Sequence, residues 1–248
     1  MKHIKRIPRR AVLSLALAAL ILTAAAGHLY RRDRPEPIPA ALDNIAYRPP
    51  CMVVVDAGHG GEDGGAVSPN GRRESEYNLE IALKTELFLR FLGMPTLMTR
   101  TEDVSLHDES SNTLRQKKIS DLNNRAALVS GLPGAILLSI HQNNFTNPHY
   151  SGAQVFHNGQ PKSQELAQTM QDALRESLDP GNRREPHRLD ILILNETRGP
   201  AILVECGFLS HAAEEARLRD PVYQTKLSIT LSTTLVNWVI STEDQTND

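Results

Sequence analysis

Short apolar segments alternate with longer amphipathic segments from residue 51 onward. The short segments are rich in β-branched and other apolar residues and have the length of buried strands. We predict strands at residues 52–56, 95–100, 135–140, 153–157, 189–194 and 201–205. The longer segments predict helices at residues 74–91, 114–129, 164–178 and 221–238. This alternation is typical of an α/β domain, so we expect a single three-layer domain in which a mostly parallel sheet of about six strands lies between helices.

The N-terminus has a different pattern. Basic residues crowd the first ten positions, and an uncharged, largely apolar run follows at residues 11–27, which is typical of an export signal or a membrane anchor. The run 24–26 (AAA) resembles a cleavage site, so the segment could be cleaved as a signal or kept as an anchor. We favour an uncleaved anchor that spans residues 1–30. Residues 31–50 are rich in proline and predict an extended tether. The folded domain is then expected at residues 51–240, followed by a polar tail at 241–248.

Charge is distributed unevenly along the chain. Residues 1–34 contain eight of the 27 lysines and arginines but only one of the 29 acidic residues, which leaves the rest of the chain with a formal charge of −9. Proteins that bind nucleic acid present basic surfaces, so we do not expect nucleic acid as a partner. A hydrophobic content of 40% and a charged content of 23% are ordinary for a globular domain.

The two cysteines, Cys51 and Cys206, could form a disulfide in an exported chain. Cys51 begins the first predicted strand, whereas Cys206 lies at the carboxyl end of the last one. The strand from Cys51 to His59 is roughly 25 Å long, and a disulfide tolerates a Cα separation of only about 7 Å. We therefore predict that both cysteines are free thiols in the core.

Three predicted strands end in polar residues that can carry chemistry. His59 follows the first strand in a glycine-rich turn, His141 follows the third, and Glu205 ends the last. The carboxyl ends of parallel strands meet at one edge of an open sheet, where ligands bind. A single histidine after a strand is more often structural, so the convergence of three segments carries the prediction. The glycine-rich turn lacks the spacing of a nucleotide-phosphate loop.

Two imidazoles and one carboxylate are a typical ligand set for catalytic zinc, because they leave a fourth position open. The third ligand is not fixed by spacing, since four acidic residues follow His59 closely. The candidates are Glu62, Asp63, Glu74 and Glu76. We therefore expect a metal site at the carboxyl edge of the strands, with the carboxylate ligand left open among these four.

Four motifs occur in order along the chain. They are residues 56–61 (DAGHGG), 74–79 (ESEYNL), 139–143 (SIHQN) and 200–211 (PAILVECGFLSH). Together they resemble the zinc-dependent N-acetylmuramoyl-L-alanine amidase family, whose pattern is D-P-G-H-G-G, E-K-x-x-N-L, S-I-H-x-N and P-A-x-L-V-E-x-G-F-x-S-N. Residues 98–100 (MTR) and 124–125 (NR) are weaker matches that support the same alignment. The resemblance spans residues 51–238.

The resemblance implies roles for individual residues. It implies that His59, Glu74 and His141 bind one Zn²⁺ and that Glu205 is the catalytic base, so it selects Glu74 among the candidate carboxylates. The chain departs from the family pattern at Ser75 and His211 and in the segment 194–197 (LNET), where the family has Lys, Asn and L-R-N-T. These departures leave the residues that contact substrate unassigned.

The implied reaction is hydrolysis of the amide between the lactyl group of N-acetylmuramic acid and L-alanine in peptidoglycan. Residues 115–125 and 150–154 look most like the spore-cortex, germination-specific branch of the family, whose members remove stem peptides so that muramic lactam forms. Since peptidoglycan lies outside the cytoplasm, the expected enzyme acts there, either membrane-anchored or secreted. A member of the spore-cortex branch would act in the space between forespore and mother cell. The alternatives are a zinc peptidase that cuts within stem peptides and a catalytically silent wall-associated module.

Regulated relatives carry an inhibitory helix after the second zinc histidine. Here only residues 142–151 separate His141 from the next strand region, which is too short for such a helix. We therefore expect control by expression timing, by the membrane tether or by an activating protein partner.

Overall fold

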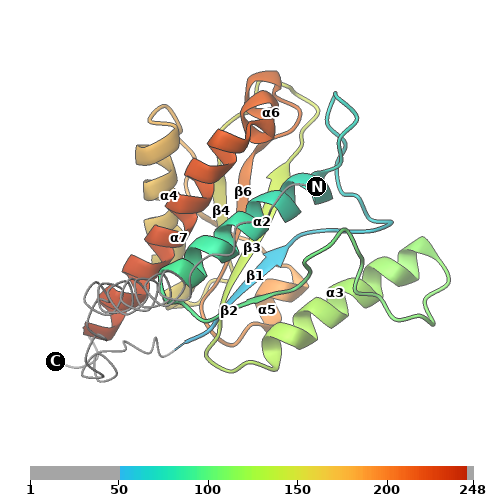
Figure 1. Cartoon of the computed structure of the whole chain (residues 1–248), viewed down its shortest axis with the longest axis horizontal. Helices are drawn as coiled ribbons and strands as arrows, with labels where there is room; N and C mark the ends of the chain where they lie inside the picture. Colours follow the sequence, from blue (N-terminus) through green and yellow to red (C-terminus); the bar gives the residue numbers. More distant parts are fainter. Residues whose placement is uncertain (1–50, 245–248) are drawn as a thin grey trace, which may run out of the picture. The chain divides into compact units, whose positions relative to one another are not determined.

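Six strands form one sheet in the computed structural model, which describes residues 51–244 (Figure 1). They are β1 (Val53–Ala57), β2 (Thr96–Met98), β3 (Ile136–Asn143), β4 (Gln154–His157), β5 (His187–Arg188) and β6 (Ala201–Phe208). Their order is β2-β1-β3-β6-β4-β5. Strands β2, β1, β3 and β6 are parallel, β4 is antiparallel to β6, and β5 is parallel to β4. The predicted, mostly parallel sheet is confirmed.

Helices cover both faces of this sheet (Figure 1). They are α2 (Glu74–Phe91), α3 (Leu114–Ser130), α4 (Pro161–Leu178), α5 (Leu192–Glu196), α6 (Ala212–Arg219) and α7 (Pro221–Asp244). Helices α2, α4 and α7 pack on one face, whereas α3 and α5 pack on the other. The expected three-layer α/β domain is therefore confirmed, and α7 continues four residues beyond position 240, where we placed the end of the domain.

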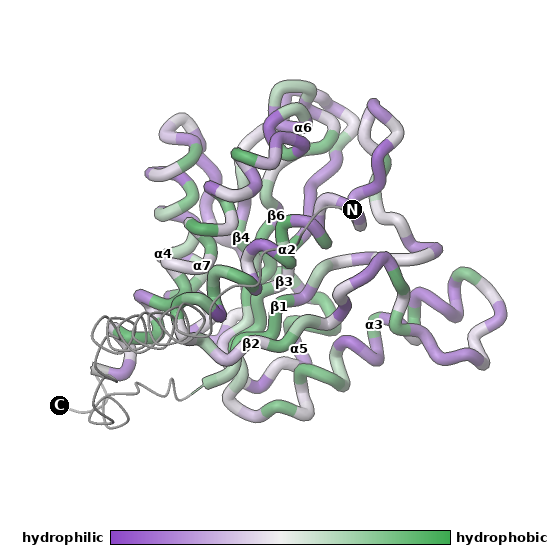
Figure 2. Tube along the Cα trace, in the orientation of Figure 1, coloured by the Kyte–Doolittle hydropathy of each residue, from purple (hydrophilic) through white to green (hydrophobic). Residues whose placement is uncertain are grey.

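Alternate residues of each strand enter different apolar cores. The larger core contains Val55, Leu138 and Val204 and lies against α2, α4 and α7. The smaller core contains Leu137 and Leu203 and lies against α3 and α5. The hydrophobic residues accordingly concentrate along the central strands (Figure 2).

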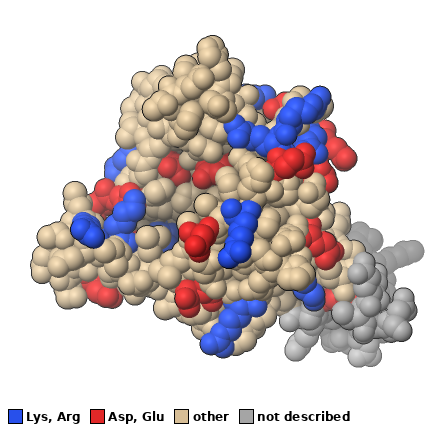
Figure 3. All heavy atoms as spheres, turned by 180° about the vertical axis from the view of Figure 1, so that it is seen from behind, with Lys and Arg blue, Asp and Glu red and all other residues tan. Residues whose placement is uncertain are grey.

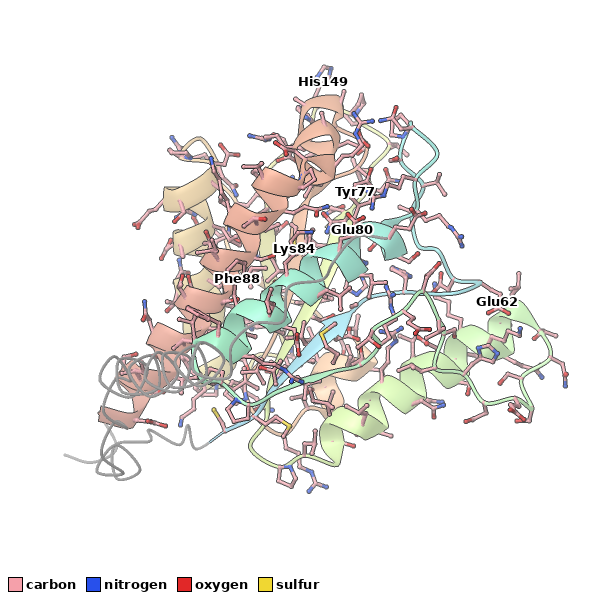
Figure 4. The ribbon with its side chains drawn as sticks, in the orientation of Figure 1. Glu62, Tyr77, Glu80, Lys84, Phe88 and His149 are labelled. Atoms are coloured by element: carbon pink, nitrogen blue, oxygen red, sulfur yellow. The ribbon has the colours of Figure 1, made fainter. Side chains whose placement is uncertain are left out.

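Helix α2 is fixed to α7 by buried polar contacts as well as apolar ones. Gln224 accepts a hydrogen bond from Lys84 (2.8 Å) and donates one to Glu80 (2.7 Å). Ser228 donates to the carbonyl of Ile81 (3.2 Å). Figure 4 shows Glu80 and Lys84 on successive turns of α2, beside α7. These contacts hold α2, and with it the acidic residue Glu74 at its first position, in place at the edge of the sheet.

Two elements differ from the sequence-based expectation. The strand predicted at residues 189–194 is wrong, because β5 covers only His187–Arg188 and α5 begins at Leu192. The apolar run 191–194 suits a short helix as well as a strand, and the helix is closed by a hydrogen bond from Thr197 Oγ1 to the carbonyl of Ile193 (2.6 Å). Helix α6 was not predicted. His211 accepts a hydrogen bond from the backbone N–H of Glu214 (3.3 Å) and so caps its start.

Both cysteines are free thiols, as predicted. Cys206 is buried and Cys51 is half-buried against the larger core. Within residues 51–244, none of the helices is long and apolar enough to cross a membrane. The expected anchor at residues 1–30 and the tether at 31–50 lie outside the described residues.

Candidate active site

His59, Glu74 and His141 meet at the carboxyl edge of the sheet. His59 follows β1, Glu74 begins α2, and His141 lies in β3. The carboxylate Oε1 of Glu74 is 3.3 Å from Nε2 of His59 and 3.0 Å from Nδ1 of His141. One donor atom from each of the three residues lies within 4.8 Å of the others. The structure thus brings together three residues that are 15 and 67 positions apart in sequence.

Two glycines make this close approach sterically feasible. A Cβ atom at Gly58 would lie 2.2 Å from Nε2 of His141, and one at Gly65 would lie 2.5 Å from Oε2 of Glu74. His59 itself has a φ of 60°, a left-handed conformation that is uncommon for residues other than glycine. A side chain at Gly58 would therefore collide with His141, and one at Gly65 would collide with Glu74 and His59.

Hydrogen bonds hold the Glu74 carboxylate in its ionised form. Oε2 accepts from the backbone N–H of Ala66 (3.0 Å) and Oε1 accepts from that of Gln142 (3.2 Å). Burial alone would raise the pKa of Glu74, but its hydrogen bonds to His141 and His59 hold that pKa well below the usual range. These hydrogen bonds therefore favour the negatively charged carboxylate.

Asp63 orients His59 from the opposite side of the ring. Its Oδ2 accepts from Nδ1 of His59 (3.1 Å), so Nε2 faces Glu74. Burial would lower the pKa of His59, but the hydrogen bonds to Asp63 and Glu74 raise it to about 9. The other two candidate carboxylates are used elsewhere. Glu62 pairs with Lys117 at the start of α3 (Figure 4), and Glu76 pairs with Arg72 (3.4 Å).

Glu205 lies beside His141 on the neighbouring strand. The two residues are in register between β3 and β6, just before a bulge that shifts the pairing. One carboxylate oxygen of Glu205 is buried without a hydrogen-bond partner among residues 51–244. Burial raises the pKa of Glu205 to about 7; the charge of Glu74 adds to the rise and His141 opposes it. A carboxyl group with this pKa can both accept and return a proton near neutral pH.

A cavity of about 250 Å³ opens next to these residues. Its walls are apolar on the side of α5 and β6, where Ile193 and Leu203 line it, and charged at Asp63 and Lys118. His59 and His141 lie in its lining, so a group bound there would be next to the imidazoles. Acidic and basic side chains are interspersed on the face of the molecule that Figure 3 shows.

Comparison with known proteins identifies this arrangement. Residues 53–237 match the family described as N-acetylmuramoyl-L-alanine amidase. The chain belongs to this family. It is 33% identical over 178 residues to the germination-specific N-acetylmuramoyl-L-alanine amidase of Bacillus subtilis, a match that covers 71% of this chain and 75% of that protein.

Solved amidases have the same fold. The CwlD amidase from Clostridioides difficile, whose structure was determined in complex with the GerS lipoprotein, is 34% identical, with a TM-score of 0.74 over 77% of this chain and 99% of that one. A second N-acetylmuramoyl-L-alanine amidase, from Clostridium difficile 630, is 29% identical, with a TM-score of 0.67 over 77% of this chain and 97% of that one. The predicted family, fold and enzyme class are confirmed: the chain is an amidase that acts on peptidoglycan.

The departures from the family pattern lie around the site and do not replace its charged residues. His211 stands where the family has asparagine, and it caps α6 through Nδ1. Ser75 is fully buried in the first turn of α2, beside Glu74. Asn195, within α5, donates to Asp190 (2.5 Å), which precedes this helix. The role of Asp63 was missed in the sequence, because its contact with His59 depends on the left-handed turn and not on a regular spacing.

Proposed function

We propose that this amidase binds one Zn²⁺ through His59, Glu74 and His141 and that Glu205 is its general base and acid. The convergence of these three side chains beside Glu205 is the observation that carries the proposal. Two ligand atoms that are about 2.1 Å from one tetrahedral zinc ion lie about 3.4 Å apart. The separations of 3.3 Å and 3.0 Å from Glu74 to the two imidazoles are close to that value, and the three donor atoms all lie within 4.8 Å of one another.

The donor set also suits zinc chemically. Two imidazole nitrogens and one carboxylate oxygen are a common ligand set in zinc hydrolases, and a carboxylate that accepts from the outer nitrogen of a ligating histidine is a common supporting contact. Asp63 makes that contact with His59. A zinc ion bound there would supply Lewis-acid chemistry, polarising the scissile carbonyl and activating water.

Glu205 moves the proton in the proposed reaction. Its carboxylate takes a proton from the attacking water as the new C–O bond forms at the lactyl carbonyl, and returns it to the nitrogen of L-alanine as the C–N bond breaks. Burial raises the pKa of Glu205 in the metal-free site, and the charge of a bound zinc ion would lower it. The cavity along α5 and β6 would hold the part of the substrate next to the scissile bond.

Digestion of purified peptidoglycan by the purified chain, with zinc and after chelation, tests this proposal. Mass spectrometry of the released material should show intact stem peptides that begin with L-alanine, and only when zinc is present. Shortened peptides would favour a peptidase that cuts within the stem. A folded, zinc-bound chain that releases nothing would point to a missing activating partner or to a silent module.

The proposed biological role is removal of stem peptides from spore cortex before muramic lactam forms. Similarity to a germination-specific amidase and to the CwlD amidase supports this role. Muropeptide analysis of spores that lack the chain tests it. Cortex from such spores should contain little or no muramic lactam, and normal levels of the lactam would contradict the proposal.

We further propose that residues 1–30 anchor the enzyme outside the cytoplasmic membrane, with residues 31–50 as the tether. The basic start and the apolar run at 11–27 support an anchor. The complex of the CwlD amidase with a lipoprotein suggests that a lipoprotein also assembles with this chain. Immunoblots of membrane fractions should detect an uncleaved chain of 27.4 kDa, whereas a shorter chain in the soluble fraction would indicate cleavage.

A further inference from the structure

Arg100 is a buried cation whose contacts differ from those of an ordinary ion pair. It follows β2 and is only 3% exposed. No ion pair joins it to an acidic residue within the described range 51–244, and its guanidinium instead donates to backbone carbonyls. Burial, together with the nearby charge of Arg125, lowers the pKa of Arg100 to about 10, so the group stays charged at neutral pH. A buried charge is costly unless its hydrogen bonds are made, and these carbonyls make them.

Three of the four carbonyls that Arg100 binds belong to the two segments that carry proposed zinc ligands, and the fourth is that of Glu102 (2.9 Å). Nε donates to the carbonyl of Ala57 (2.8 Å), and Nη2 donates to that of Gly58 (3.1 Å), both just before His59. Nη2 also donates to the carbonyl of Ser75 (2.8 Å), the residue after Glu74. One rigid guanidinium therefore links the backbone beside His59 to the backbone beside Glu74.

The turn at His59 is shaped around this side chain. Successive carbonyls of a strand point to opposite sides, but those of Ala57 and Gly58 both accept from Arg100 because the chain leaves the strand here. His59 takes its left-handed conformation at this point. The backbone at Gly60 then passes so close to Arg100 that a Cβ atom there would lie 3.0 Å from Nε. The left-handed backbone conformation of His59 is thus held by contacts that include those of Arg100 with the two preceding carbonyls.

Arg125 provides a useful contrast. It is also buried, but it pairs with Asp56 (2.7 Å) and Asp121 (2.7 Å). Its backbone contacts are to the carbonyls of Ala57 (2.8 Å) and His59 (2.7 Å), which belong to the β1 segment alone. Arg100, by contrast, donates to carbonyls of both the β1 turn and the start of α2.

We propose that Arg100 is a positioning residue, whose planar guanidinium sets the distance between His59 and Glu74 by binding the carbonyls beside each. The inference rests on the proposed zinc site formed by these two residues and His141. A lysine could keep the positive charge, but its single ammonium group lacks the planar fork that reaches several carbonyls in fixed directions. The guanidinium geometry, and not the charge alone, is therefore the feature that matters.

The test compares zinc affinity in the full chain and in three variants, measured by competition with a chromogenic chelator. Arg100→Met removes the charge and the fork, and Arg100→Lys keeps the charge alone. Leu174→Ala, at a residue of α4 that is buried in the larger core, is a control that lowers stability without touching the site. Loss of contacts that orient metal ligands typically weakens metal binding by about 10- to 100-fold, and we expect this loss in both Arg100 variants but not in the control. The visible spectrum of the cobalt-substituted protein should change in the same two variants.

Each outcome decides the proposal. Unchanged zinc affinity in a folded Arg100→Met chain would overturn it. Wild-type affinity in Arg100→Lys would show that charge alone suffices, and an equal loss in Leu174→Ala would show a general effect of stability. If Arg100→Met does not fold, Arg100→Lys alone decides. Failure of the wild-type chain to bind zinc would instead contradict the proposed function, so the two failures are distinguishable.

Discussion

The two faces of the sheet bury different kinds of side chain from the same strands. On the face covered by α2, α4 and α7, β1, β3 and β6 contribute apolar residues such as Val55, Leu138 and Val204. On the face covered by α3 and α5, the same three strands contribute Asp56, His141 and Glu205 toward their carboxyl ends. The alternation of side chains along a strand allows this division.

The strand residues on one face of the sheet mainly stabilise the fold, whereas those on the other face include the residues of the proposed active site. The larger core is apolar along most of these strands, and the polar residue that β3 contributes on this side, Gln142, lies at its carboxyl end, where it donates to Asn78 (3.3 Å). The smaller core shares its side of the sheet with the buried Asp56–Arg125 pair and with the cavity beside the histidines. Mutations on the two faces should therefore differ in kind: on the first they should reduce stability, and on the second they should also change activity or pH dependence.

Replacing Glu205 by glutamine should have the largest effect on activity. The substitution keeps the size of the side chain but removes the group that accepts and returns the proton. General acid–base catalysis contributes about 10²- to 10⁴-fold to rate, and we expect turnover on peptidoglycan to fall by that factor while zinc binding and the melting temperature stay near wild type.

A matched substitution on the surface of α4, Glu176→Gln, serves as the control and should leave turnover unchanged. His141→Ala should differ from both, because it should lose zinc as well as activity. If Glu205→Gln retained full turnover, the assignment of the base would be wrong.

Replacing Asp56 by asparagine should have the next largest effect, on stability. Asp56 is 2% exposed and accepts from Arg125 (2.7 Å) and Ser139 (2.6 Å). Removing one member of a buried ion pair leaves the other charge poorly compensated, which costs about 3–5 kcal/mol. We expect the free energy of unfolding at pH 7 to fall by about 3 kcal/mol, measured by urea denaturation.

The same substitution should also change how stability depends on pH. Burial would raise the pKa of Asp56, but Arg125 and the hydrogen bonds from Ser139 and Thr99 lower it below its ordinary value. Its stabilising effect is therefore complete above the unfolded pKa of about 3.9 and is lost as the pH falls through the lower, folded value. The stability difference between wild type and Asp56→Asn should shrink as the pH falls below about 4. A constant difference down to pH 2 would show that folding does not lower the pKa of Asp56.

Leucine-to-alanine substitutions compare the packing of the two faces directly. Leu138 is fully buried in the larger core, whereas Leu203 lies in the smaller one and lines the cavity. Buried leucine-to-alanine changes cost about 2–5 kcal/mol, and less where the surroundings can relax. We expect Leu138→Ala to lower the free energy of unfolding by about 3–4 kcal/mol and Leu203→Ala by about 2 kcal/mol. Equal losses would mean that the cavity side is packed as tightly as the other.

Three of the four proposed site residues could be predicted from their places at the ends of strands, but the fourth could not be predicted from the sequence spacing. His59, His141 and Glu205 could be predicted because each follows or ends an apolar strand, and parallel strands end at one edge. The place of Glu74 in the site could not be derived this way. It begins a helix and reaches the histidines only because α2 packs against α7 and the sheet, so it was selected by resemblance to the family pattern.

The contacts around these residues could not be predicted at all. The hydrogen bonds of Arg100 to backbone carbonyls depend on the conformation of a turn and leave no pattern in the sequence. Residues 98–100 (MTR) matched the family pattern, but that match did not predict these contacts. The short helix α5 was predicted as a strand, because its apolar residues fill the smaller core and local polar signals are few. Errors of this kind concentrate where tertiary contacts decide the local structure.

The smallest effect is expected from the exposed ion pair between Arg90 and Glu86, near the end of α2. Like Asp56 with Arg125, it joins an acid and an arginine, but the Arg90 side chain is 63% exposed, so water screens the attraction. Exposed pairs of this spacing are worth about 0.3–0.5 kcal/mol. Arg90→Met should therefore change the free energy of unfolding by less than about 1 kcal/mol and leave turnover unchanged, because Arg90 lies at the opposite end of α2 from Glu74. Urea denaturation at low and high salt would check the first point, and a turnover assay on peptidoglycan would check the second. A loss comparable to that of Asp56→Asn would mean that position on the helix, and not burial, decides what an ion pair contributes to this fold.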